Sequence, residues 1–199
     1  MQPKNGVPLF DEAEHRYTWN GKTPPGVTSI LQSVNPVRYA HNPKLLERGK
    51  YFHRLCHAVA NNTFDFASDK LDGEEIGIAA AYSFFLSTMG LGNEVPMIEQ
   101  PLVSRTGYAG TPDQVFFQNK VLVDLKFGVK QKKPHTHQLV AYFNLLLENY
   151  PDLVKRSEWK LIAVYPKDNS TFKSMTVKFT PTNLSKWNAY LIVYKDKEG

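Results

Sequence analysis

Two kinds of apolar pattern alternate along this chain. Apolar residues that recur every three or four positions are typical of helices packed on a core, and short runs rich in Val, Leu and Phe are typical of strands. The first pattern predicts helices over 27–34, 43–61, 74–89, 134–149 and 181–194. The second predicts strands over 97–104, 115–117, 120–127, 159–165 and 172–179. An N-terminal hairpin is predicted from strands 7–10 and 15–19, closed by Asn20 and Gly21.

After the N-terminal hairpin and the short helix over 27–34, the predicted order is helix, helix, three strands, helix, two strands, helix. This order favours a mixed sheet flanked by helices, in the α/β or α+β class. At 199 residues the chain is most simply a single domain with a sizeable core. We divide it into a hairpin and lead-in over 1–40 and a core over 41–199. The sequence contains no internal repeat or low-complexity tract.

Two of the predicted strands are separated by Gln118 and Asn119, which favour a tight turn. If the residues on either side of this turn pair with each other, Asp113 falls directly opposite Asp124. Opposed residues share one face of a sheet, with Cβ atoms about 4.5–5.5 Å apart. Lys126 lies two positions beyond Asp124 and therefore points to the same face. The sequence thus predicts two carboxylates and an ammonium group side by side.

Such a group of side chains suits phosphodiester chemistry. Two adjacent carboxylates repel each other unless a cation lies between them, and Mg²⁺ prefers hard oxygen ligands. Lys126 could orient an attacking water or stabilise charge on the phosphate. The alternative is a surface hairpin that carries an ordinary Asp–Lys pair, because such charges are common at strand edges.

The same residues resemble the motif of the PD-(D/E)xK nuclease superfamily. Pro112-Asp113 matches the first half of that motif, and Asp124-Leu125-Lys126 matches the second. Two further matches are similar to the RecB-type exonuclease branch: a Gln-x-x-x-Tyr pattern over 138–142 and a Gly-x-x-x-His pattern over 49–53. The opening residues look like those of small phage and mitochondrial exonucleases, and the resemblance covers about 14–180.

This resemblance implies a restriction-endonuclease-like core with a metal site. His53, Asp113 and Asp124 would hold one or two Mg²⁺ or Mn²⁺ ions, together with the main-chain carbonyl of Leu125. Glu99 would match a further acid that some members carry before the first motif. Many members have Glu at the position of Asp124, and the shorter Asp side chain could alter the metal spacing.

The resemblance also implies an activity. Lys126 would be the catalytic lysine, and Gln138 and Tyr142 would hold the active site and the DNA strand. The expected function is a metal-dependent DNA exonuclease of phage type, which acts in recombination, replication or end processing. Its partners would be DNA ends and a recombination or replication protein. Two alternatives stay open: a structure-specific endonuclease on the same fold, and a nuclease-like module that only binds DNA or a partner protein.

A rival metal site involves two histidines. His53 and His57 lie four residues apart on one predicted helix and could bind zinc together, although no matching third ligand is evident nearby in the sequence. We interpret His57 as a packing or DNA-contacting residue instead. The single cysteine, Cys56, excludes an internal disulfide and the four-cysteine iron–sulfur cluster that some RecB-type nucleases hold, and we interpret it as a packing residue.

Composition and net charge say less about function than the motifs do. A hydrophobic content of 42% with 22% charged residues is typical of soluble globular proteins. No apolar run approaches the roughly 20 residues needed to span a bilayer, so we expect no membrane contact and a cytoplasmic location, the host cytoplasm if the chain is phage-encoded. The net charge of +5 is compatible with nucleic acid. Candidate contacts to DNA phosphates follow Lys126 in the sequence: Lys130, Lys132, Lys133 and His135. The alternative is that this segment is a solvated basic loop.

Overall fold

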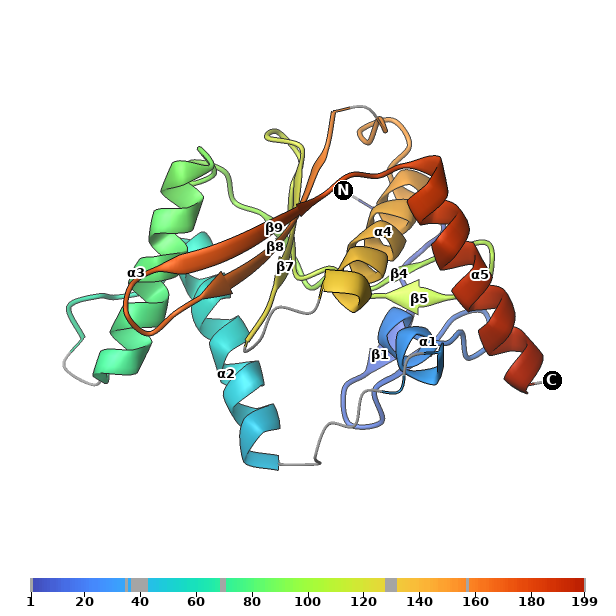
Figure 1. Cartoon of the computed structure of the whole chain (residues 1–199), viewed down its shortest axis with the longest axis horizontal. Coiled ribbons are helices and arrows are strands. Elements are labelled where there is room, and N and C mark those ends of the chain that lie inside the picture. The colour runs from blue at the N-terminus through green and yellow to red at the C-terminus, as the bar shows by residue number, and fades with distance from the viewer. Residues whose placement is uncertain are drawn as a thin grey trace.

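The computed structural model describes residues 2–34, 36, 43–68, 71–127, 132–156 and 158–198. A five-stranded mixed sheet forms its centre (Figure 1). β7 and β8 run parallel, and the other neighbouring pairs in this sheet run antiparallel. The predicted mixed sheet is therefore confirmed. In spatial order its strands are β3 (Met97–Ile98), β6 (Gln114–Phe116), β7 (Val121–Leu125), β8 (Lys160–Pro166) and β9 (Phe172–Val177).

Helices cover both faces of this sheet. α2 and α3 lie on one face, and α1, α4 and α5 lie on the other (Figure 1). All five predicted helices are present, and α5 extends beyond residue 194. Among the described residues, none of the helices combines the length and apolar character needed to cross a membrane. The helices are α1 (Val27–Val34), α2 (Pro43–Ala60), α3 (Gly73–Thr88), α4 (Lys132–Asn149) and α5 (Pro181–Glu198).

The central strand β7 separates two hydrophobic cores. Val121, Val123 and Leu125 pack in the core beneath α2 and α3. Leu122 packs in the core beneath α4 and α5. Because side chains alternate along a strand, Asp124 shares the Leu122 face. A strand covered on both faces must be apolar almost throughout, which explains the continuous apolar run of β7 and makes its one carboxylate conspicuous.

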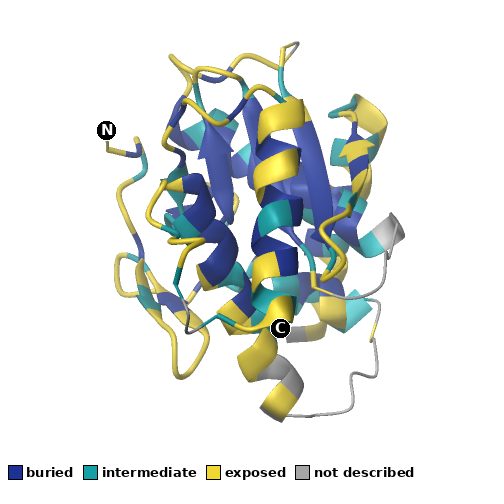
Figure 2. Cartoon of the chain, turned by 90° about the vertical axis from the view of Figure 1, so that its left-hand side faces the viewer, coloured by how far each residue is buried: buried dark blue, intermediate teal, exposed yellow. Residues whose placement is uncertain are grey.

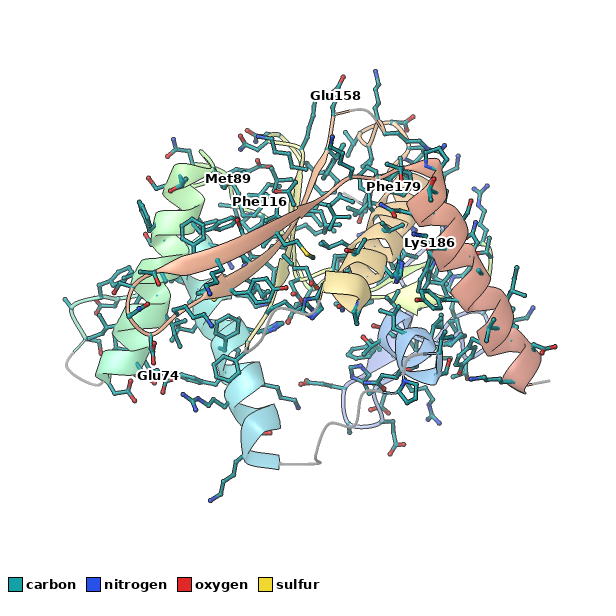
Figure 3. All side chains as sticks on the ribbon, in the orientation of Figure 1. Glu74, Met89, Phe116, Glu158, Phe179 and Lys186 are labelled. Atoms are coloured by element: carbon teal, nitrogen blue, oxygen red, sulfur yellow. The ribbon has the colours of Figure 1, made fainter. Side chains whose placement is uncertain are left out.

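The two cores hold the sheet rigidly from both sides. In Figure 2, which views the molecule from the side of α3, the strands are dark blue behind a helix whose outer surface is exposed. Phe116 reaches from the sheet towards α3, whereas Phe179 lies beside α4 and α5 (Figure 3). Full burial of one such phenylalanine contributes about 1.5–3 kcal/mol. The strand that carries Asp124 is therefore fixed in place by packing on each face.

The hairpin of β6 and β7 has the register predicted from the sequence. Gln114 pairs with Val123, and Phe116 pairs with Val121. At the turn each strand is one residue shorter than predicted; β6 begins one residue earlier, and β7 ends two residues earlier. Continued past the start of β6, this register sets Asp113 opposite Asp124, as expected.

The predicted strand over 97–104 is not continuous. The chain leaves the main sheet at Glu99, which has a φ of 44° in the left-handed region. Pro101, which lacks an N–H donor, follows two residues later. The chain then forms β4 (Leu102–Val103), which pairs with β5 (Ala109–Gly110) in a separate two-stranded sheet. The break brings the Glu99 side chain to the end of the main sheet.

The N-terminal hairpin forms, but its turn lies elsewhere than predicted. β1 (Leu9–Asp11) pairs with β2 (Arg16–Thr18) through a connection over 12–15. Asn20 and Gly21, with φ values of 48° and 71°, make a separate tight turn just after β2. An Asn-Gly turn requires positive φ at both central residues. The tight turn at Asn20 and Gly21 is therefore confirmed, but it does not connect β1 to β2.

Candidate metal centre

The predicted metal-site residues and Lys126 lie around the C-terminal end of β7. This end of the strand lies between α2 and α4 (Figure 1). Just beyond it, the Phe127 ring packs at a tilt against Phe52 of α2, with centroids 5.4 Å apart. The site can therefore receive side chains from both helical layers as well as from the sheet. His53 comes from α2, and Tyr142 comes from α4.

Asp113 connects the hairpin to α2. Its Oδ2 accepts the main-chain N–H of Leu125 at 2.6 Å, across the end of the β6–β7 ladder. Its Oδ1 lies 3.6 Å from Nδ1 of His53. The Asp113 carboxylate is thus held by the backbone of β7 while its second oxygen faces the histidine that the motif identified.

Asp124 is the most deeply buried acid of the site, with 1% of its surface exposed. Its Oδ2 lies 2.8 Å from Nζ of Lys126. Its Oδ1 has no hydrogen-bond partner in the part of the chain that the structure describes. Burial raises the pKa of Asp124 to about 7, the Lys126 ammonium opposes this, and the Asp113 charge adds to it. A buried carboxylate oxygen without a donor costs free energy, so this group is suited to a cation.

Glu99 joins the site from the break after β3. Its Oε1 lies 3.1 Å from Nε2 of His57 and 4.0 Å from Nδ1 of His53. The hydrogen bond from His57 is the main reason why the pKa of Glu99 is lowered. One ligating atom from each of the three side chains lies within 4.8 Å of the other two. Glu99 is therefore the third potential ligand that the two-histidine interpretation lacked in the sequence.

Gln138 and Tyr142 meet on one face of α4, as their four-residue spacing predicts. Nε2 of Gln138 donates to the Tyr142 hydroxyl at 3.0 Å. Burial raises the pKa of Tyr142 well above its ordinary value, and the charges of Asp124 and Asp113 raise it further. The hydroxyl therefore stays protonated and can donate its own hydrogen to an anionic group.

Three further residues of the site were missed or misread in the sequence. Gln114 is fully buried, and its Nε2 lies 2.9 Å from Nδ1 of His57. Its Oε1 accepts the hydroxyl of Tyr82 on α3. His57 is buried, is hydrogen-bonded to Gln114 and lies 3.1 Å from Glu99, so it is a member of a polar network. Gln114 lies just before the predicted strand over 115–117, so the sequence pattern did not mark it as a core position.

His135 does not sit where the phosphate-contact prediction expects it. It is buried, and its Nδ1 lies 2.5 Å from the hydroxyl of Tyr165. Burial, with the nearby charge of Lys126, lowers the pKa of His135 to about 4. The side chain is neutral at neutral pH and lies beneath the surface, so a direct phosphate contact by an imidazolium is not supported.

The three lysines named as phosphate contacts stay a prediction. Lys130 lies outside the described residues. Lys132 and Lys133 form the start of α4, but their side chains also lie outside the described part of the chain. Cys56, by contrast, is fully buried between α2 and the sheet, where burial raises the pKa of its thiol well above the ordinary value. It therefore packs, as predicted.

The site combines carboxylates with an imidazole and one ammonium group at the end of a rigid strand. Carboxylates and imidazole are ligands for divalent cations such as Mg²⁺, Mn²⁺ and Zn²⁺, and the buried Asp124 oxygen fits this chemistry. Comparison with protein-family models found no matching family. Comparison with curated proteins found no matching relative either.

Proposed function

We propose that the chain is a divalent-metal-dependent deoxyribonuclease of the PD-(D/E)xK type, most similar to RecB-type exonucleases. The observation that carries this proposal is the arrangement of Asp113, Asp124 and Lys126 around the end of one hairpin. The order of strands in the main sheet, with helices on both faces, is compatible with a restriction-endonuclease-like core.

Mg²⁺ or Mn²⁺ would be held by His53, Asp113 and Asp124, together with the main-chain carbonyl of Leu125. Glu99 would add a further carboxylate. When bound, a divalent cation supplies charge stabilisation at the phosphate oxygens and makes a water more acidic. The buried Oδ1 of Asp124, which has no donor among the described residues, supports cation binding at this position.

The remaining residues would act on the DNA directly. Lys126 carries three N–H donors and is 18% exposed, so its ammonium can reach a phosphate oxygen or a water. The protonated Tyr142 hydroxyl, oriented by Gln138, would donate to the DNA backbone. The Asp113 carboxylate would hold the β7 backbone in place through the N–H of Leu125.

The preference for an exonuclease rests on the RecB-type motifs at His53 and at Gln138 with Tyr142. The site also lies at the end of the sheet, between two helices, rather than on an open face. A closed circle tests this preference directly.

The decisive experiment uses linear single- and double-stranded DNA, labelled separately at the 5′ and 3′ ends, with Mg²⁺ or Mn²⁺. A closed circle, an EDTA control and the Lys126→Ala variant accompany the wild-type chain. Lys160→Ala is a matched control, because Lys160 is exposed at the start of β8, beside the opposite end of β7. We expect metal-dependent loss of the linear DNA by wild type and Lys160→Ala, with the circle intact.

Each other outcome selects an alternative. Cleavage of the circle would identify a structure-specific endonuclease on the same fold. DNA binding without cleavage in either metal would favour a binding module. Full activity of Lys126→Ala would contradict the assignment of this site.

A further inference from the structure

A chain of close polar contacts runs from the core under α3 to the metal centre. The Tyr82 hydroxyl donates to Oε1 of Gln114. Nε2 of Gln114 lies 2.9 Å from Nδ1 of His57, and Nε2 of His57 lies 3.1 Å from Oε1 of Glu99. Tyr82 and Gln114 are fully buried, and 8% of His57 is exposed. We call these four residues the Tyr82–Glu99 relay.

The amide of Gln114 gives this relay a direction. Its Nε2 lies 3.5 Å from the carbonyl oxygen of Cys56, as well as close to His57. An amide nitrogen can donate to that carbonyl, whereas an amide oxygen in its place would repel it. The other end of the amide, Oε1, accepts a hydrogen bond from the Tyr82 hydroxyl. The Gln114 nitrogen therefore donates to Nδ1 of His57, and Nδ1 acts as the acceptor.

The direction of the hydrogen bond from Gln114 determines which ring nitrogen of His57 carries the proton. A neutral imidazole whose Nδ1 accepts a hydrogen bond carries its proton on Nε2. Nε2 lies 3.1 Å from Oε1 of Glu99, so the imidazole and the carboxylate are in direct polar contact, although the orientation of the ring does not give an aligned hydrogen bond among the described residues. A histidine that binds metal through Nε2 instead donates its Nδ1–H to an acceptor, and Gln114 offers a donor at that place. His57 is therefore not equivalent to His53, although both lie on one face of α2.

We propose that His57 is a positioning residue whose Nε2–H holds the Glu99 carboxylate beside His53 and Asp113, so that Glu99 completes the metal centre. Gln114 and Tyr82 set the tautomer of His57. This inference rests on the proposed metal-dependent function, because it assigns Glu99 to that same centre. It replaces the two-histidine zinc site with a single histidine ligand and a carboxylate held by the second histidine.

Glu99 needs such a partner because of its position. Its side chain is 51% exposed, and its backbone turns away from the main sheet with a φ of 44°. A free glutamate at a surface turn loses considerable rotamer freedom when it is ordered. The buried imidazole of His57 supplies a fixed donor that reduces this freedom before any cation binds. The relay thus links a rigid core to the most exposed ligand.

The tautomer of His57 can be measured directly. ¹⁵N spectra of the imidazole rings in the metal-free protein distinguish a protonated Nε2 from a protonated Nδ1, and the His57→Gln variant identifies the signals of His57. We expect a proton on Nε2 that persists when Mg²⁺ is added. A proton on Nδ1, or a shift of Nε2 typical of a metal ligand, would overturn the relay.

Equilibrium binding of Mn²⁺ tests the role of the relay at the centre. We expect His57→Ala and Glu99→Gln each to weaken Mn²⁺ binding by about tenfold or more, as loss of a partner of a metal ligand commonly does. If His57 acts only through Glu99, the double variant binds no more weakly than Glu99→Gln alone. His57→Gln should recover much of the loss, because its amide can donate near the position of Nε2. His15→Ala, which removes an exposed imidazole on the N-terminal hairpin, is the matched control.

The outcomes separate the relay from the function on which it rests. A wild-type chain that binds no Mn²⁺ would overturn the proposed function and the role of Glu99 with it. Normal Mn²⁺ binding by wild type and by a folded His57→Ala variant would overturn the relay alone. Circular dichroism verifies folding, and His57→Gln replaces His57→Ala in the comparison if the alanine variant does not fold. Equal binding by His57→Gln, Glu99→Gln and wild type would likewise overturn it.

Discussion

Asp124 and Lys126 form an ion pair on one face of β7, with 2.8 Å between Oδ2 and Nζ. Leu125, between them, packs into the core on the opposite face. The strand thereby fixes the spacing of the two charged groups. In the metal-free chain the ammonium is the principal positive charge next to a carboxylate that is almost completely buried. The pair therefore relates metal binding, stability and cleavage to one another.

The first prediction concerns cleavage. Asp124→Ala removes a proposed metal ligand, and Lys126→Ala removes the donor beside it. Each variant should lower the rate of cleavage by about 10²-fold or more, since groups that stabilise developing charge typically contribute this much. Nucleotide release from linear DNA measures the rate, and circular dichroism verifies the fold. Wild-type rates in either folded variant would contradict the mechanism.

The second prediction concerns stability in EDTA. Asp124→Asn should raise the free energy of unfolding at pH 8 by about 1–3 kcal/mol, because it removes a buried charge whose raised pKa represents about 1.4 kcal/mol per unit. The gain is smaller than the full shift implies, because Lys126 loses its partner. Urea unfolding of the metal-free proteins measures it. An Asn variant less stable than wild type at pH 8 would show that the ion pair outweighs the burial.

The same carboxylate predicts a dependence on pH. The pKa of Asp124 is about 7 in the folded chain against an ordinary 3.8, so the folded state binds an extra proton between these values. Its contribution to stability is therefore present at low pH and is lost as the pH rises through about 7. His135, with a pKa lowered to about 4, acts with the opposite sign below pH 6.5. The difference in the free energy of unfolding between wild type and Asp124→Asn isolates the Asp124 contribution. This difference should favour the Asn variant increasingly from pH 5 to pH 8.

Local pattern was sufficient for much of this site. The turn residues Gln118 and Asn119 set the register of the hairpin, and the register places Asp113 opposite Asp124. Both are consequences of short-range rules, because a short loop leaves few ways to pair its strands. The four-residue spacing of Gln138 and Tyr142 is also a short-range feature, and it correctly predicted that the two side chains meet on one helix face.

Contacts between residues far apart in the sequence could not be predicted from local pattern. Glu99 reaches His57 only because the chain turns at a left-handed residue, and a non-glycine residue at positive φ has no strong sequence signal. Gln114 meets Tyr82 across two layers of the fold, from residues far apart in the sequence. Nothing in the local pattern of either segment specifies that meeting. The burial of His135 likewise depends on Tyr165, which belongs to β8.

The third prediction concerns metal and stability. Mg²⁺ or Mn²⁺ that binds only the folded chain should raise its stability, by about 2.7 kcal/mol at a free concentration of 100 times Kd. Asp113→Asn, which weakens the ligand set, should show a much smaller rise at the same concentration. Thermal unfolding with and without EDTA measures both. An equal rise in wild type and Asp113→Asn would place the bound ion elsewhere.

The last prediction concerns Gly110, which precedes Asp113 by three residues. A Cβ at this position would lie 2.8 Å from Cε1 of Tyr142 and 3.0 Å from both Leu145 and Val27. Gly110→Ala should therefore cost about 1–3 kcal/mol through overpacking. It should also displace the Tyr142 ring, and shifts of about 1 Å can reduce catalysis by about 10²-fold.

Gly77→Ala separates these two effects. A Cβ there would lie 1.6 Å from the carbonyl oxygen of Asp168, where α3 meets the turn between β8 and β9. This variant should lose stability as well, but it leaves Tyr142 in place. At a temperature where both variants are folded, cleavage should fall in Gly110→Ala and stay near wild type in Gly77→Ala. If cleavage falls equally in both, the loss arises from general destabilisation, and Gly110 then has no specific part in placing the Tyr142 ring.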